Sequence, residues 1–153
     1  MKALVQRVSR ASVRVDGATV GAIGGGLLVL AGFGRSDTNE DLLWTAGRIA
    51  NLRIFPDDRG AMNLSLLDTG GSILLVSQFT LHADTAKGRR PGFARAADPV
   101  RAEMLFRLFA SMLEDTGLEV QRGVFGAMME VELVNDGPVT IMIDSPCERV
   151  AGA

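Results

Sequence analysis

Apolar and polar residues alternate along several stretches of the chain, which is the pattern of half-buried β-strands. Residues 2–15 alternate in this way, and the turn residues 16–18 lead into a second alternating run at 19–23, so the chain is predicted to open with a hairpin. Gly24-Gly25-Gly26 predict a tight turn before an apolar strand over 27–33. A phosphate loop is disfavoured here, because neither a Lys-Ser/Thr pair nor a helix follows the glycines.

Two later segments have apolar residues at helical spacing. Thr38 is suited to cap the first helix, with Asp41 in its first turn, and Asp98 caps the second, with Pro99 at its first position and Gly117 at its end. The single tryptophan, Trp44, and the methionines of the second helix are assigned to packing. The apolar stripes are Leu42, Leu43, Ala46, Ile49 and Ala50 in the first helix, and Val100, Met104, Leu105, Leu108, Phe109, Met112 and Leu113 in the second.

The remaining pattern predicts further strands joined by short turns. These strands cover residues 52–55, 72–81, 118–123, 129–134 and 139–144, and turns are expected at 56–60 and 68–71. The elements together predict an α+β fold: one domain over residues 1–153, with a curled, barrel-like antiparallel or mixed β-sheet and two flanking helices. Residues 145–153 are expected to form a loose tail.

Composition narrows the class of protein. With 153 residues, 47% of them apolar and 22% charged, the chain can fill one core. The longest apolar run, residues 27–31, is far too short to cross a membrane, so a soluble cytoplasmic protein is expected. Cys147 and His82 are the only residues of their kinds, which excludes an internal disulfide and leaves no ligand set for zinc. We therefore expect neither a metal nor another cofactor.

The net charge of −2 does not by itself indicate a nucleic-acid partner. Basic residues gather locally, at Arg7, Arg10 and Arg14 in the first strand and at Lys87, Arg89, Arg90 and Arg95 in a later loop. Charge alone favours solvated faces for both groups. A noncatalytic RNA-binding module that uses the loop remains an alternative.

The stretch SQFTLHADT, residues 77–85, contains the residue types of a hydrolase triad. If the strand runs through residue 81, however, Ser77 and His82 point to opposite faces, so the histidine cannot easily serve the serine. Thr80 shares its face with Gln78, which is not a base.

The stretch LVNDGPVTIMI, residues 133–143, reads as a hairpin with its turn at 135–137. Pro138 is unusual at the start of a returning strand, because proline donates no ladder hydrogen bond and fixes its own φ. It therefore indicates either a sheet edge or an unusual peptide geometry.

SQFTL at 77–81 and NDGPVT at 135–140 together resemble the two signature motifs of the D-aminoacyl-tRNA deacylases, the editing family once called D-tyrosyl-tRNA deacylases. The resemblance covers nearly the whole chain. The flanking segments ALVQRVSRASVRVDG, GLLVL, RIFPD, MNLSL, GGSILLVSQFTLHADT and RRPGF also occur in the family order.

The resemblance implies a homodimer that acts on the 3′ end of aminoacyl-tRNA. In the family, a cis Gly-Pro pair from one subunit, here Gly137-Pro138, enters the active site of the other. By resemblance the Phe79 amide stabilises the oxyanion, Ser77 and Gln78 position the substrate, and Thr80 borders the reacting centre as a nucleophile or as an orienting group. Asn135 and Thr140 of the second motif are expected to help form the substrate site.

Three further expectations concern mechanism. Arg7 is either an anchor for the Gly-Pro segment or an exposed strand arginine. Main-chain carbonyls of that segment would bind the substrate ammonium and exclude L side chains, so glycyl-tRNA should also be hydrolysed. With no usable base, the vicinal ribose hydroxyl of the terminal adenosine would assist water; a serine esterase acting through Ser77 is the competing mechanism.

Overall fold

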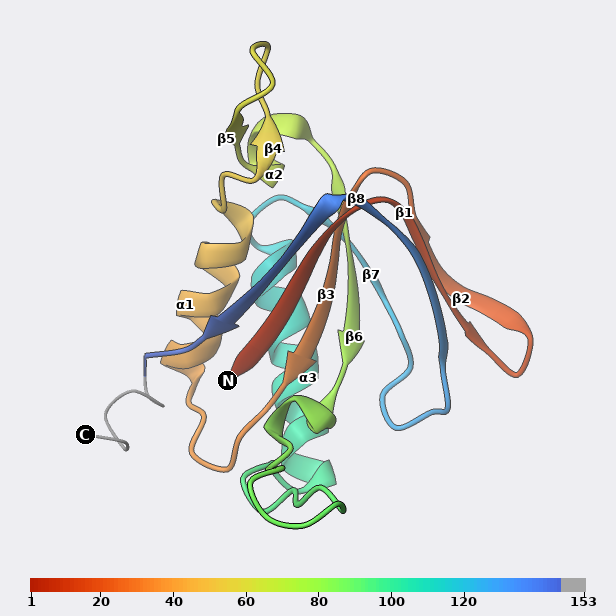
Figure 1. The fold of residues 1–153 in the computed structure, drawn as a ribbon, viewed down its shortest axis with the longest axis vertical. Coiled ribbons are helices and arrows are strands. Elements are labelled where there is room, and N and C mark those ends of the chain that lie inside the picture. The colour runs from red at the N-terminus through yellow and green to blue at the C-terminus, as the bar shows by residue number, and fades with distance from the viewer. Residues whose placement is uncertain (147–153) are drawn as a thin grey trace.

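The computed structural model describes residues 1–146. Six strands form a mixed β-sheet with helices packed outside it, and two short antiparallel strands form a separate hairpin (Figure 1). The strands are β1 (Lys2–Val15), β2 (Ala18–Ile23), β3 (Gly26–Gly32), β4 (Phe55–Pro56), β5 (Met62–Leu64), β6 (Ser72–Ser77), β7 (Glu119–Arg122) and β8 (Glu130–Asp144). The helices are α1 (Asn39–Ala50), α2 (Leu66–Thr69), the 3₁₀ helix η1 (Phe79–His82) and α3 (Pro99–Glu114). None of the helices in this described part is long and apolar enough to cross a membrane.

The main sheet has the order β2-β1-β3-β6-β7, with β8 paired to β1. The β3–β6 and β6–β7 pairs are parallel, and the pairs made by β1 are antiparallel. The sheet curls until β2 approaches β7, where a Cβ atom on Gly21 would lie 2.9 Å from the Arg122 carbonyl oxygen. The predicted α+β, barrel-like mixed sheet is confirmed.

Two hydrophobic cores lie on opposite faces of the same strands, because side chains alternate along a strand. Leu27 and Val29 of β3 face the layer formed by α1 and α3, whereas Leu28 belongs to the second core inside the curled sheet. In β6, Ile73 and Leu75 face the helices, and Leu74 and Val76 face inward.

The opening hairpin and both helix starts are as predicted. Asp16 and Gly17 adopt positive φ values of 51° and 79° in the turn between β1 and β2. Thr38 and Asp41 form a capping box at the start of α1, and the Asp98 side chain accepts the Arg101 amide at the start of α3.

Five predicted elements differ from the structure in extent or in type. The strand expected over 72–81 ends at Ser77, where the chain turns into η1. The strand expected over 52–55 is reduced to β4, and the turn expected at 68–71 partly belongs to α2, a third helix with a Ser65–Asp68 capping box. The strands predicted at 129–134 and 139–144 form one strand, β8, rather than the two arms of a hairpin.

The apolar stripes are also narrower than predicted. Val100 and Met104 on α3 and Leu43 on α1 are exposed, at 82%, 56% and 63%, so the packing role assigned to Met104 is wrong. The reason is the direction of the buried face: α3 buries the face that carries Leu105, Phe109 and Leu113, and the adjacent row faces outward. Met112 and Trp44 do pack against the core.

The start of the chain is tied to the end of β8. The Met1 ammonium is buried, lies 2.8 Å from an Asp37 carboxylate oxygen and also donates to the Ser145 hydroxyl. The Ser145 amide donates to the Met1 carbonyl oxygen at 2.9 Å. Ser145 is therefore part of the fold rather than of a loose tail, and the expectations for Cys147 and for the rest of the tail lie outside the described residues.

Candidate active site

The first group of predicted site residues lies where β6 leaves the sheet. Ser77 is the last residue of β6, paired with Ala31 of β3, and the Gln78 amide donates to the Ala31 carbonyl oxygen at 2.8 Å. Gln78 is the N-cap residue of η1, which starts at Phe79, but its side chain makes no capping hydrogen bond. The alternation of faces expected from 77 to 82 does not hold, because these residues are not one strand.

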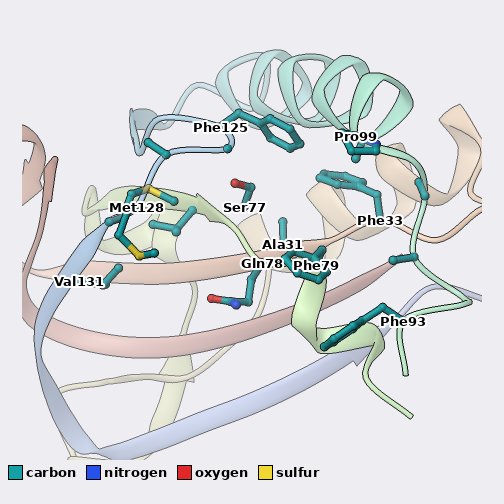
Figure 2. A pocket seen from close by; sticks show the side chains of 17 residues that line it. Ala31, Phe33, Ser77, Gln78, Phe79, Phe93, Pro99, Phe125, Met128 and Val131 are labelled. Carbon is teal, nitrogen blue, oxygen red and sulfur yellow. The ribbon is translucent and has the colours of Figure 1, made fainter. Parts of the chain in front are cut away.

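A pocket of about 640 Å³ opens at this point (Figure 2). It lies among the ends of β3 and β6, the start of α3 and the segment that leads into β8. No ionisable side chain is among its lining residues, which are Ala31, Phe33, Val76, Ser77, Gln78, Phe79, Phe93, Ala96, Ala97, Pro99, Ala102, Phe125, Gly126, Ala127, Met128, Met129 and Val131. Its polar groups are therefore neutral side chains and backbone.

The Phe79 amide is a free hydrogen-bond donor at this pocket. As the first residue of η1, Phe79 has no acceptor for its amide within the helix. The amide also donates to no other group among residues 1–146. The Phe79 ring is 56% exposed and meets Phe93 edge to face, with ring centroids 5.0 Å apart. A developing negative charge on a substrate oxygen could be stabilised by such an amide, which is already fixed in place.

The polar side chains beside this amide are held in different ways. Gln78 donates through its amide group to the Thr80 hydroxyl in a close contact. This bond makes the Thr80 oxygen an acceptor and leaves its proton available to another group. Thr80 is exposed and does not line the pocket, whereas Ser77 and Gln78 do.

His82 is placed away from these groups. Its side chain is 2% exposed and lies beside the backbone of Gly32 and Gly34, outside the pocket lining. Ser77 and His82 are therefore separated, as predicted, but the reason differs. They are not on opposite faces of one strand, because the strand ends at Ser77 and His82 belongs to η1. The pocket does not contain a Ser-His pair.

The second group of predicted site residues forms a bulge in β8. Residues 136–139 stand opposite the single residue Arg7 of β1, because Asn135 pairs with Val8 and Thr140 with Gln6. The Gly137–Pro138 peptide bond is cis, as the resemblance implied. Gly137 has φ +146°, and a Cβ atom there would lie 2.8 Å from the Val139 side chain, so the position requires glycine.

Asn135 closes the bulge with its side chain. Its oxygen accepts the Val139 amide at 2.7 Å, and its nitrogen donates to the Val139 carbonyl oxygen at 3.2 Å and to the Thr140 hydroxyl at 3.0 Å. Gln6 also donates to the Thr140 hydroxyl, at 3.2 Å. Asn135 and Thr140 therefore maintain the shape of the bulge.

Arg7 connects the bulge to the rest of the fold. Its Nε atom donates to the Asp136 carbonyl oxygen at 2.8 Å, and its Nη1 atom donates to the Ile54 carbonyl oxygen. The Arg7 side chain is only 12% exposed, whereas the Asp136 side chain is 60% exposed. The contacts fit an anchor for the Gly-Pro segment better than an exposed strand arginine.

The two groups do not meet within this chain. The bulge stands opposite Arg7, which pairs with Leu27, and Leu27 pairs with Ile73 of β6, four residues before Ser77. Three strand spacings and four residues along a strand correspond to about 20 Å across the sheet. In Figure 1 the bend of β8 lies at one end of the sheet and the segment that follows β6 lies at the other.

One wall of the pocket was not predicted from the sequence. It is the segment between β7 and β8, which contributes Phe125, Met128 and Met129. Met128 is 91% exposed and Val124 is 44% exposed, an unusual amount of apolar surface for a connecting segment. The sequence signal was the apolar character of residues 124–128, which lie outside any predicted element.

Fold and pocket together define a class: single-domain α+β proteins with a curled mixed sheet and a neutral pocket at the end of a parallel strand pair. The family model described as D-Tyr-tRNA(Tyr) deacylase matches residues 4–144, and the chain belongs to this family.

The relatives cover nearly all of the chain. The D-aminoacyl-tRNA deacylase of Shouchella clausii is 56% identical, over 95% of this chain and 99% of the relative. The D-aminoacyl-tRNA deacylase of Roseiflexus castenholzii is 58% identical, over 97% of this chain and 95% of the relative. A solved structure named c-Myc DNA Unwinding Element Binding Protein has a TM-score of 0.90 and 44% identity, over 95% of this chain and 99% of that one. A probable eukaryotic D-amino acid tRNA deacylase, at 18% identity and a TM-score of 0.81, shares the fold.

Proposed function

We propose that this protein hydrolyses the ester bond of D-aminoacyl-tRNA and releases free tRNA and the D-amino acid. The family and the names of its relatives support this activity. The chemical proposal rests on one observation about the pocket. The Phe79 amide is a free donor there, and no ionisable side chain lines the pocket. Such a site can accelerate the cleavage of an activated ester by orientation and by oxyanion stabilisation.

The proposed reaction uses water and the RNA itself. The substrate carbonyl carbon lies beside Phe79, and Ser77 and Gln78 position the ester. Thr80 orients the part of the ester that lies nearest to solvent. Water attacks the carbonyl carbon, and its proton passes through the vicinal ribose hydroxyl of the terminal adenosine. The oxyanion that forms accepts a hydrogen bond from the Phe79 amide. The ester bond between the carbonyl carbon and the ribose oxygen then breaks. The ribose oxygen takes the proton that came from water.

We further propose that the active unit is a homodimer, in which the β8 bulge of one subunit completes the pocket of the other. The separation of about 20 Å between the two groups in one subunit supports a site built from two copies. Apolar side chains exposed along β8 and the segment before it, Met128, Val131, Val134 and Met142, offer surface for such an interface.

We propose that this bulge selects substrates by handedness. Main-chain carbonyls of Gly137 and Pro138 would bind the substrate ammonium and occupy the side on which an L side chain projects. D side chains would project outward, and glycine, which has none, would also be accepted. We therefore propose that glycyl-tRNA is a substrate. We also propose that the protein acts in the chiral proofreading of translation, in the cytoplasm.

The test is turnover at substoichiometric enzyme with D-tyrosyl-, L-tyrosyl- and glycyl-tRNA. Release of the D-amino acid and of glycine, with the L ester intact, is the expected result. Binding of all three without turnover would contradict the proposal. A matched substrate whose terminal adenosine lacks the vicinal hydroxyl should be cleaved at least a hundredfold more slowly, and equal cleavage would refute the RNA-assisted step.

Dimerisation has its own measurement. Sedimentation at micromolar concentration should give the mass of two chains, and an active monomer would exclude the site shared between subunits.

A noncatalytic nucleic-acid-binding module is the second candidate. The structural neighbour at 44% identity is named for DNA binding, and the loop with Lys87, Arg89 and Arg90 is cationic. Inert, salt-sensitive binding of both mirror-image esters would favour this alternative over the enzyme.

A further inference from the structure

A cationic loop stands at the mouth of the pocket, between η1 and α3. It spans residues 83–97 and contains Lys87, Arg89, Arg90 and Arg95, and the exposed Arg35 lies against its base. No acidic residue occurs between positions 85 and 97. The four loop cations are exposed, and none forms an ion pair within the described residues.

The base of this loop is fixed by the fold. Asp84 and Gly92 exchange backbone hydrogen bonds of 2.8 and 2.9 Å, which close a tip made of residues 85–91. The Arg35 amide donates to the Arg95 carbonyl oxygen at 3.1 Å, and the Ala97 amide donates to the Phe33 carbonyl oxygen at 2.9 Å. The tip is therefore held at one place beside the pocket, where it appears in green in Figure 1.

The two acids nearest the tip, Asp84 within the loop and Asp98 just after it, each accept a backbone amide. Asp84 accepts the Ala86 amide at 2.9 Å, and Asp98 accepts the Arg101 amide at 3.0 Å. The cations of the tip face solvent and form no ion pair within the described residues. This is a local positive surface on a chain whose net charge is −2.

The loop is also joined directly to the proposed reaction site. Phe93 belongs to the loop, lines the pocket and packs edge to face on Phe79, whose amide is the proposed oxyanion donor. Arg90 is three residues from Phe93, so their Cα atoms are no more than about 11 Å apart. A nucleic-acid strand that enters the pocket on the side of Phe93 would pass close to these cations.

We propose that the 83–97 loop is the docking surface for the phosphates of the tRNA acceptor strand, and that it draws the 3′ end toward the pocket. This inference rests on the proposed function. Arginine and lysine bind phosphate without reading sequence, so the loop would serve many tRNAs alike. Binding would be salt-dependent, because each neutralised phosphate of a single strand contributes about 0.7 to the slope of log K against log salt.

The test uses a triple variant with Lys87→Gln, Arg89→Gln and Arg90→Gln. Its binding to a fluorescently labelled, unacylated acceptor-stem minihelix with a single-stranded 3′ end is measured by anisotropy between about 50 and 300 mM KCl. We expect at least tenfold weaker binding at low salt and a slope that is shallower by about 2, from three lost phosphate contacts. Unchanged affinity and slope would overturn the proposal.

A matched control separates the loop from bulk charge. The variant with Arg48→Gln, Arg59→Gln and Arg107→Gln removes three exposed arginines elsewhere and changes the net charge equally. It should bind the minihelix within about twofold of the parent. An equal loss in both variants would show that total charge, rather than this loop, attracts the RNA, and would overturn the proposal.

A small substrate distinguishes this proposal from the enzymatic one. D-tyrosyl-adenosine has the ester but no phosphate, so the loop variant should cleave it at the parent rate while losing at least tenfold in kcat/KM on D-tyrosyl-tRNA. If neither protein cleaves either substrate, the proposed activity fails, and the minihelix measurement still decides whether the loop docks RNA. Equal losses on both substrates would contradict a docking role.

Discussion

Replacement of Arg7 tests whether main-chain contacts hold the β8 bulge in its orientation. Arg7→Met removes the donors to the carbonyl oxygens of Asp136 and Ile54. Hydrogen bonds to charged groups contribute about 1.5–3 kcal/mol each, and partial exposure of the site favours the lower end. The expected loss is therefore about 3 kcal/mol in the free energy of unfolding. Arg7→Lys, which can reach one carbonyl but cannot form the fork, should lose about half as much.

Asp136→Asn serves as the matched control. It removes the carboxylate that lies 3.7 Å from Arg7 but leaves the backbone carbonyl that accepts the closer hydrogen bond. Because the Asp136 side chain is 60% exposed, this ion pair should contribute at most about 0.5 kcal/mol. Urea unfolding gives the three free energies, and deacylation of D-tyrosyl-tRNA gives kcat/KM. The loss in kcat/KM should follow the same order, largest for Arg7→Met, smaller for Arg7→Lys and smallest for Asp136→Asn.

Two results would refute this reasoning. If Asp136→Asn costs as much as Arg7→Met, the ion pair holds the bulge rather than the two carbonyls. If Arg7→Met leaves both stability and kcat/KM unchanged, Arg7 is not an anchor.

Three further predictions address other parts of the chain. Gly137→Ala should cost about 1–3 kcal/mol in urea unfolding because its φ is +146°, whereas Gly24→Ala, with open space around it, should be nearly neutral; equal costs would contradict the account. Ser77→Ala should reduce kcat/KM modestly, and a serine-directed phosphonate should not label the protein; labelling would restore the esterase mechanism.

The last of the three concerns acid stability. Burial raises the pKa of Asp41, but four effects together outweigh it and hold that pKa below its usual value. These are hydrogen bonds with the Thr38 backbone, the Ser145 side chain and the Thr38 side chain, and the charge of the N-terminal ammonium. A lowered pKa stabilises the fold above the unfolded pKa near 4, and this contribution disappears as the pH falls through the folded value. Thermal melts of Asp41→Asn should therefore depend less on pH below about 4 than those of the parent, and parallel pH profiles would contradict this.

Local chemistry allowed much of the fold to be predicted from the sequence. The Asp16-Gly17 turn and the Thr38 and Asp98 caps depend on residues within a few positions of one another. The end of β6 at Ser77 could not be predicted, because alternation continues past it and only the pairing with Ala31 shows where the ladder stops. The exposure of Met104 could not be predicted either. An apolar stripe on a helix does not show how much of that helix face the neighbouring elements cover.

The candidate site divides in the same way. Its residues came from two motifs whose chemistry could be named, but the distance between them depends on the register of four strands. The bulge arises because four residues of β8 oppose Arg7 alone, and the sequence resembled a hairpin turn there. The wall around Met128 had no motif and was found only through the fold.

The two cores share β3 and β6, and this arrangement has a consequence for how the protein can change. A substitution at Leu28 disturbs the inside of the curled sheet, and one at Val29 disturbs the helix layer, yet both residues belong to the strand that ends beneath the pocket. Heat tolerance and turnover should therefore be difficult to adjust separately in this chain. Variants selected for growth in the cold or in the heat would be expected to keep these two strands intact and to vary the hairpin of β4 and β5 instead.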